Sequence, residues 1–130
     1  CLRNRARSFI FSTAPAPACA AAADCAVSII ESEPDRVGRL RANAVFFADE
    51  LARRGICVRS ASAILPVVVG DEGKALEASA RLEEMGFLIP AIRYPSVALG
   101  AARLRATVSS EHSRAQISAA AEAIAGCLSG

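Results

Sequence analysis

The order of apolar and polar positions predicts two helices in the first part of the chain. The stretch from about Pro17 to Ile30 is rich in alanine, the best helix former, and is apolar on nearly every side, as buried helices are. A second helix is expected from its start at residues 32–34 to Gly55. Its apolar positions recur every three or four residues: Val37, Leu40, Ala44, Phe47 and Leu51. Its charged residues are expected to face solvent: Arg36, Arg39, Asp49 and Glu50.

The middle of the chain predicts short strands around one further helix. Strands are expected near residues 56–58, over 64–69 and over 87–89, because these short runs are rich in apolar and β-branched side chains. The helix is expected from about Glu72 to Met85, with Gly86 as its stop. Prolines and Gly100 then bracket a loop over residues 91–100.

The end of the chain predicts one amphipathic strand and one helix. Residues 102–108 alternate strictly, so the apolar side chains share one face and Arg103, Arg105 and Thr107 share the other. Residues 113–116 have the pattern of a capping box and open a helix that ends near Gly126. The order α-α-β-β-α-β-β-α predicts a small two-layer α/β domain, in which helices cover a mixed or antiparallel sheet.

Composition narrows the class of protein. The chain has 130 residues, of which 53% are hydrophobic, and this is enough for the core of one domain. Its formal net charge of +2 is too small to favour a nucleic acid or an anionic membrane as partner. The longest apolar run, around residues 14–23, contains two prolines and falls short of the roughly 20 residues that a membrane span needs. Arginines before this run imitate a secretion signal, but prolines and hydroxyl residues stand where leucine is expected.

The first residue and the cysteines bear on the origin of the chain. The chain begins with Cys1 and its only methionine is Met85, which predicts a processed chain or a piece of a longer one. Five cysteines without a C-x-x-C pair support neither a disulfide framework nor a zinc site. Reduced thiols that are mostly buried, and with them a cytoplasmic location, are expected.

Few residues could carry catalysis. The single histidine, His112, excludes a histidine metal cluster and is expected to be a turn or cap residue before the last helix. No glycine-rich phosphate loop is present, and Lys74, the only lysine, is expected to be a solvated residue in the first turn of its helix.

Three places remain as candidates for binding. Arg105, on a strand that otherwise buries small apolar residues, suits a two-point grip on a carboxylate. Arg93 lies on the proline-bracketed loop, and functional residues are frequent on loops. Ser12 and Thr13 precede a helix start, where hydroxyls and free N–H groups suit a phosphate. Each place also has an ordinary structural explanation: Arg103 and Arg105 could form a solvated sheet face, and Thr13 could be a helix cap.

Four segments together resemble the C-terminal part of the α-oxoamine synthases, pyridoxal-phosphate enzymes with the aspartate-aminotransferase fold (fold type I). These segments are RSFIFSTAP at residues 7–15, AIRYPSV at 91–97, GAARLRATVS at 100–109 and Glu111-His112. They follow one another in the family's order across essentially the whole chain. The Ala-Ile-Arg-x-Pro loop is most similar to the 8-amino-7-oxononanoate synthases of biotin synthesis. Glycine C-acetyltransferases and 5-aminolevulinate synthases usually differ in that loop.

The resemblance implies an acyltransferase that condenses an amino acid with an acyl thioester and releases carbon dioxide; in the biotin branch these are L-alanine and a pimeloyl thioester. It implies that Arg105 binds the carboxylate of the amino acid and that Ser96 and Arg93 line the substrate end of the pocket. It also implies that Thr13, with Ser12, reaches the phosphate of pyridoxal 5'-phosphate in the partner subunit of a homodimer.

The chain lacks the residues that hold and activate the cofactor in this family. The Schiff-base lysine, the carboxylate on the pyridine nitrogen and the stacked histidine all precede the Phe-Ser-Thr segment in this family, so none of them is present here. Ala98 also stands where the family often has proline. No catalytic residue is expected in this piece, which is predicted to be inactive alone.

The resemblance also predicts how the chain is organised. Residues 1–31 are expected to border a missing N-terminal cofactor domain, and residues 32–130 to form the small C-terminal α/β domain. One alternative is a sibling α-oxoamine synthase. A second is a free-standing α/β binding module without catalysis.

Overall fold

The computed structural model describes Arg5 and residues 14–59 and 62–129. The chain divides into two units, Cys1–Pro34 and Asp35–Gly130. In the first unit, helix α3 (Pro17–Ser32) begins with a proline, whose missing N–H is no loss at a helix start. The predicted helix over residues 17–30 is therefore confirmed. No residue of α3 is buried, and Val27 and Ile30 are more than half exposed. The prediction of mostly buried thiols is wrong, because among the described cysteines Cys19, Cys25 and Cys57 are exposed and Cys127 alone is buried. Among the described helices, none combines the length and the apolar character needed to cross a membrane.

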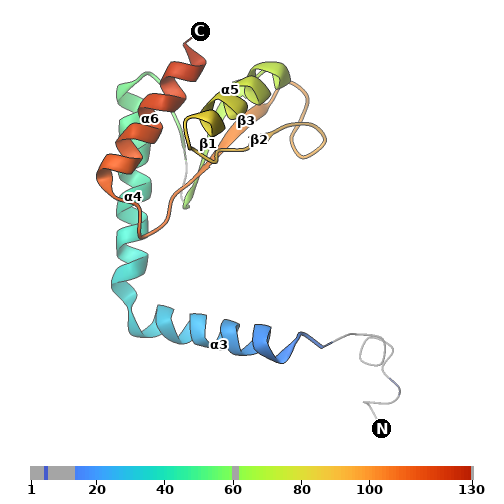
Figure 1. The fold of residues 1–130 in the computed structure, drawn as a ribbon, viewed down its shortest axis with the longest axis vertical. Helices are drawn as coiled ribbons and strands as arrows, with labels where there is room; N and C mark the ends of the chain where they lie inside the picture. Colours follow the sequence, from blue (N-terminus) through green and yellow to red (C-terminus); the bar gives the residue numbers. More distant parts are fainter. Residues whose placement is uncertain (1–4, 6–13, 60–61, 130) are drawn as a thin grey trace. The chain divides into compact units, whose positions relative to one another are not determined.

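The second unit is built on a three-stranded sheet (Figure 1). Strand β3 (Ala102–Thr107) lies in the middle and pairs antiparallel with β1 (Ile64–Gly70) on one side and β2 (Ala91–Ile92) on the other. The register of β1 on β3 shifts between Val68 and Gly70, and beyond the shift Gly70 still pairs with Ala102. Gly70 has a φ of +89°, which glycine adopts without strain, so β1 can turn sharply there.

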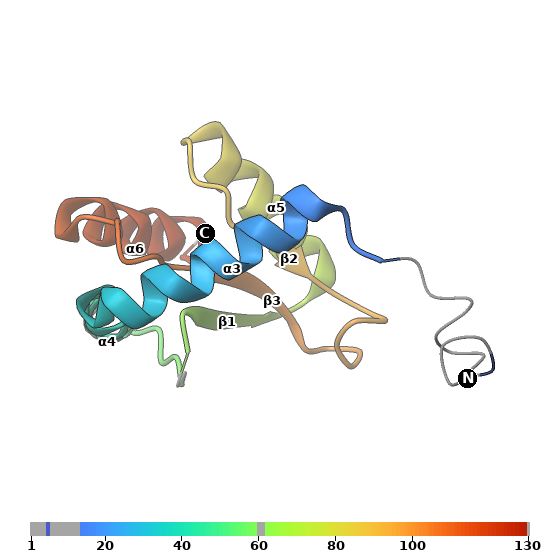
Figure 2. The same cartoon turned by 90° about the horizontal axis from the view of Figure 1, so that it is seen from below.

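Helices cover one face of this sheet. They are α4 (Pro34–Arg53), α5 (Glu72–Glu84) and α6 (Arg114–Leu128), and Figure 2 shows α5 and α6 on the same side of β1 and β3. The side chains that solvent does not reach come from both layers: Leu51, Leu82 and Ile124 from the helices and Leu65, Val67 and Leu104 from the strands. The predicted two-layer α/β fold is confirmed, and its sheet is antiparallel.

The capping box predicted for the last helix is also confirmed. The Gln116 backbone N–H donates to Ser113 Oγ (3.2 Å), and the Ser113 N–H donates to Gln116 Oε1 (2.9 Å). Two N–H groups at the start of α6, which have no partner within the helix, are thereby satisfied.

Two of the predicted strands are wrong. Residues 56–58 form no strand, because the Ile56 N–H donates to the Leu51 carbonyl (3.0 Å) and the segment closes α4. Residues 87–89 form none either, because the Phe87 N–H closes α5 in the same way, donating to the Leu82 carbonyl (2.8 Å). Strand β2 instead starts at Ala91, inside the predicted loop. The order is therefore α-α-β-α-β-β-α over the elements from α3 to α6.

Candidate functional site

The sheet face that points away from the helices carries the arginines of β3. Strand β3 buries its alanines and Leu104 and turns Arg103, Arg105 and Thr107 the other way, which confirms the predicted alternation. Arg105 lies opposite Pro66 of β1. The three strands contain no acidic residue, so the arginines give this face, which we call the open face, a positive charge.

The backbone of Arg105 is held by a hydrogen bond, and its side chain is exposed. Its N–H donates to the Pro90 carbonyl (2.9 Å), so its position along the sheet is set. Within the described residues, its guanidinium has no hydrogen-bond or ion-pair partner. Arg103, by contrast, donates from Nε to the Ala101 carbonyl (3.0 Å). An exposed guanidinium on a rigid strand suits a carboxylate, which it can hold through two parallel hydrogen bonds.

The loop between β2 and β3 carries Arg93 and Ser96, and both side chains are exposed. The Ser96 N–H donates to the Arg93 carbonyl (3.0 Å), which forms a tight turn. Because Ile92 lies opposite Arg103, the loop leaves the sheet beside the start of β3, two residues along the strand from Arg105. No hydrogen bond or ion pair in the described part of the chain joins this loop to Arg105, so a site shared by all three residues stays a prediction.

The other residues considered for cofactor chemistry are less informative. Ser12 and Thr13, predicted to bind a phosphate, lie outside the described residues. Lys74 is exposed in the first turn of α5, as predicted, and its backbone N–H donates to Asp71 Oδ1 (2.8 Å). Of the predicted site residues, Arg105 is the one whose exposed guanidinium on a strand suits a carboxylate; its role in an amino-acid site stays a prediction.

His112 is a turn residue, as the sequence predicts. Its Nδ1 accepts a hydrogen bond from the Ser109 N–H (3.1 Å). The side chain of Asn43, on α4, holds the turn by donating from Nδ2 to the carbonyls of Ser109 (3.0 Å) and His112 (2.9 Å). This turn links the end of β3 to the start of α6, so Asn43 helps to fix both elements.

Sequence reasoning missed the roles of Asn43 and Glu50, the buried polar residues of α4. The expectation that Glu50 faces solvent is wrong, because it is only 7% exposed. Both follow the apolar helical period: Asn43 comes three residues after Leu40, and Glu50 comes three after Phe47. A polar residue at a position of the apolar stripe was the sequence signal that could have predicted their burial.

Glu50 accepts hydrogen bonds from two arginines at the end of α4: Arg53, its last residue, and Arg54, which follows it. Arg54 donates from Nη1 to Glu50 Oε2 (2.7 Å), and Arg53 donates to Oε1. The hydrogen bond from Arg54 is the main reason why the pKa of Glu50 lies below its ordinary value of 4.5; the charges of Arg53 and Arg54 add to this, and burial opposes it. This cluster stabilises the end of α4 and is separate from the open face.

Comparison with known proteins relates the chain to one family. The family model for aminotransferase class I and II matches residues 1–124. The 8-amino-7-oxononanoate synthase of Methylobacterium radiotolerans is 48% identical over 124 residues, which are 95% of this chain and 32% of that protein. The protein of the same name from Anaeromyxobacter dehalogenans is 47% identical over 131 residues, covering 99% of this chain and 33% of its own length.

Solved structures share the fold. An 8-amino-7-oxononanoate synthase from Francisella tularensis matches 96% of this chain and 37% of its own, with a TM-score of 0.78 and 27% identity. A serine palmitoyltransferase from S. paucimobilis matches 97% of this chain and 32% of its own, with a TM-score of 0.85 and 24% identity, which shows the fold alone. These likenesses confirm the predicted fold class. The chain spans about a third of the length of the curated relatives it matches.

Proposed function

The chain belongs to the aminotransferase class I and II family, and we propose that it is the C-terminal part of an acyltransferase resembling 8-amino-7-oxononanoate synthase. The whole enzyme would condense L-alanine with a pimeloyl thioester and release carbon dioxide, as a step of biotin biosynthesis. Relatives of that name match nearly the whole chain at 47–48% identity, which supports this reaction over that of a sibling synthase. Because the chain spans about a third of their length, the rest of the enzyme would lie elsewhere in a longer polypeptide.

One observation on this chain carries the proposal: the guanidinium of Arg105 on the open face, which has no partner among the residues that the structure describes. Arginine stays charged at every physiological pH, and its planar group matches a carboxylate in geometry as well as charge. Arg105 would hold the carboxylate of L-alanine and so fix the orientation of the amino acid for reaction. Arg93 and Ser96, on the loop beside β3, would line the substrate end of the same pocket.

Pyridoxal 5'-phosphate, when bound, would supply the electron sink that this chemistry needs. Ser12 and Thr13 would hold the cofactor phosphate across the interface of a homodimer. The only lysine, Lys74, is exposed at the start of α5 and is not proposed to attach the cofactor. The catalytic lysine would belong to the missing part, so this chain alone is predicted to be inactive.

The proposal extends to the organisation and location of the enzyme. Residues 1–31 would border the N-terminal cofactor domain, and residues 32–130 would form the small domain. Helix α3 is largely apolar and buries none of its residues within its own unit, which supports a packing partner for that helix. The enzyme would work in the cytoplasm.

The experiment that tests this function uses the longer polypeptide encoded by the gene. We expect it to release carbon dioxide from L-alanine with a pimeloyl thioester, and much more slowly from glycine with an acetyl or succinyl thioester. A preference for glycine would replace the proposed reaction with that of a sibling synthase. A stop codon followed by a start codon near Cys1 would contradict the proposal and favour a free-standing binding module.

A further inference from the structure

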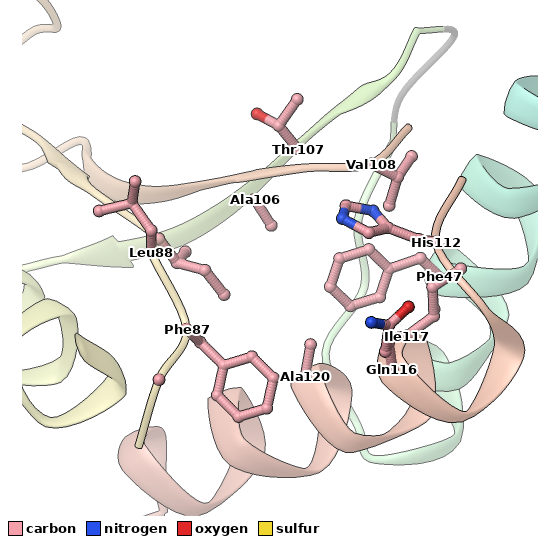
Figure 3. Close-up of a pocket in the computed structure, with 12 residues that line it drawn as sticks. Phe47, Phe87, Leu88, Ala106, Thr107, Val108, His112, Gln116, Ile117 and Ala120 are labelled. Atoms are coloured by element: carbon pink, nitrogen blue, oxygen red, sulfur yellow. The ribbon is translucent and has the colours of Figure 1, made fainter. Parts of the chain in front are cut away.

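A pocket of about 310 Å³ lies in the second unit, and neither Arg103 nor Arg105 lines it. Its walls come from the segment after α5, the end of β3 and the first turns of α6 (Figure 3). Most of the lining is apolar, including Phe47, Phe87 and Leu88. Leu88 is 84% exposed, so the pocket opens to solvent beside an apolar rim.

His112 contributes a polar donor to this apolar pocket. Since the Ser109 N–H donates to Nδ1 of the ring (3.1 Å), the proton of the neutral imidazole is on Nε2. Figure 3 shows the ring nitrogen farther from the backbone pointing into the open space of the pocket. Within the described residues, this nitrogen has no hydrogen-bond partner.

Gln116 contributes a second donor. Its Oε1 accepts a hydrogen bond from the Ser113 N–H in the capping box (2.9 Å). Because an N–H needs an acceptor, this bond identifies which of the two terminal amide atoms is the oxygen and which is the nitrogen. The amide nitrogen therefore points the other way, toward the same open space as the His112 ring (Figure 3). It too has no partner among the described residues.

The charge around these donors favours an anion. The lining contains no acidic side chain. The nearest carboxylate in sequence, Glu111, is paired with Arg36 (3.3 Å) and Arg39 (3.7 Å) of α4. Gln116 also lies in the first turn of α6, where the partial positive charge of the helix attracts anions. His112 and Gln116 are both exposed, so the two N–H donors lie at the open edge of the apolar pocket. A few polar groups beside an apolar pocket can orient a small ligand that has one polar end.

We propose that this pocket binds the carboxylate of a small molecule with a short apolar body. His112 Nε2 and the Gln116 amide nitrogen would each donate a hydrogen bond to the carboxylate. The apolar body would lie between Phe87 and Ala120, where it is removed from water. Arg105 does not line this pocket, so a result on hexanoate binding and a result on the Arg105 substrate site can be told apart.

Binding can be measured on the 130-residue chain with hexanoate as the probe and amide NMR shifts as the readout. Saturable shifts of resonances from the lining, for example Ala106 and Ile117, are expected with hexanoate and much weaker ones with hexanol. Gln116→Glu is the informative variant, because glutamate keeps the capping acceptor and removes the donor. It should weaken hexanoate binding by about tenfold or more, whereas the matched Glu122→Gln variant on the same helix should bind normally.

A second variant tests the pocket independently of the donors. Ala120→Phe fills the floor of the pocket and should abolish the saturable shifts. The proposal is wrong if hexanoate gives no saturable shift in the original chain. It is also wrong if Gln116→Glu binds hexanoate as tightly as the original chain does.

Discussion

Arg103 and Arg105 point to the same side of β3, yet of the two only Arg103 has a partner in the described part of the chain. The Nε of Arg103 donates to the Ala101 carbonyl (3.0 Å), whereas the guanidinium of Arg105 has no hydrogen bond or ion pair within the described residues. Arg103 therefore helps to fix the end of the loop that precedes β3. Arg105, held in register by the Pro90 carbonyl, is left free for a ligand.

Asn43→Asp should destabilise the chain by about 1–3 kcal/mol. The side chain keeps its size, but a carboxylate cannot donate, so the carbonyls of Ser109 and His112 both lose their hydrogen bonds. Urea unfolding at neutral pH would measure the loss. The exposed residue Asp49 on the same helix provides the control, since Asp49→Asn should change stability by less than about 0.5 kcal/mol. Equal stability of the two variants would mean that Asn43 does not hold the turn.

Glu50→Gln should lower stability at neutral pH, and the difference from the original chain should shrink in acid. The folded state holds the pKa of Glu50 below its ordinary value of 4.5, mainly through the hydrogen bond from Arg54. The carboxylate thus stabilises the fold above that ordinary value, and the contribution is lost as the pH falls through the lowered pKa. Melting temperatures from pH 7 downward would show this, with Glu83→Gln on the exposed side of α5 as the control. A difference that stays constant with pH would contradict the role given to Glu50.

Leu104→Ala should cost about 2–5 kcal/mol of unfolding free energy. Leu104 is fully buried on the middle strand, where removing its side chain leaves a cavity between the sheet and the helices. Leu99→Ala, five positions earlier, removes a side chain that is 75% exposed and should have little effect. Denaturant unfolding would measure both variants. Similar losses of unfolding free energy would mean that Leu104 is not part of the core.

The sequence was most informative where one physical signal dominates. The strict alternation of residues 102–108 predicts both β3 and its open face, because one side of the strand buries small apolar groups and the other carries charge. The Ser113 capping box and the proline at the start of α3 likewise mark helix starts through local chemistry alone. These signals do not depend on what packs against the element.

The sequence failed where the choice of partner for a backbone N–H decides the outcome. Phe87 belongs to an apolar run that suits a strand, but its N–H is taken by the Leu82 carbonyl. Strand β2 has only two residues, and it forms because β3 is present beside it. Whether the Arg105 side chain has a hydrogen-bond partner could not be predicted either. That depends on which carbonyls and carboxylates the fold brings near its guanidinium.

The most direct test of the proposed function is the KM for the amino-acid substrate in the longer enzyme with Arg105 replaced. Arg105→Ala should raise the KM for L-alanine by about tenfold or more, while cofactor absorbance stays normal. Arg105→Lys should recover only part of the loss, because lysine keeps the charge but not the two-point geometry. Arg81→Ala, an exposed arginine on α5, should leave the KM unchanged. An unchanged KM in Arg105→Ala would remove Arg105 from the substrate site and contradict the proposed function.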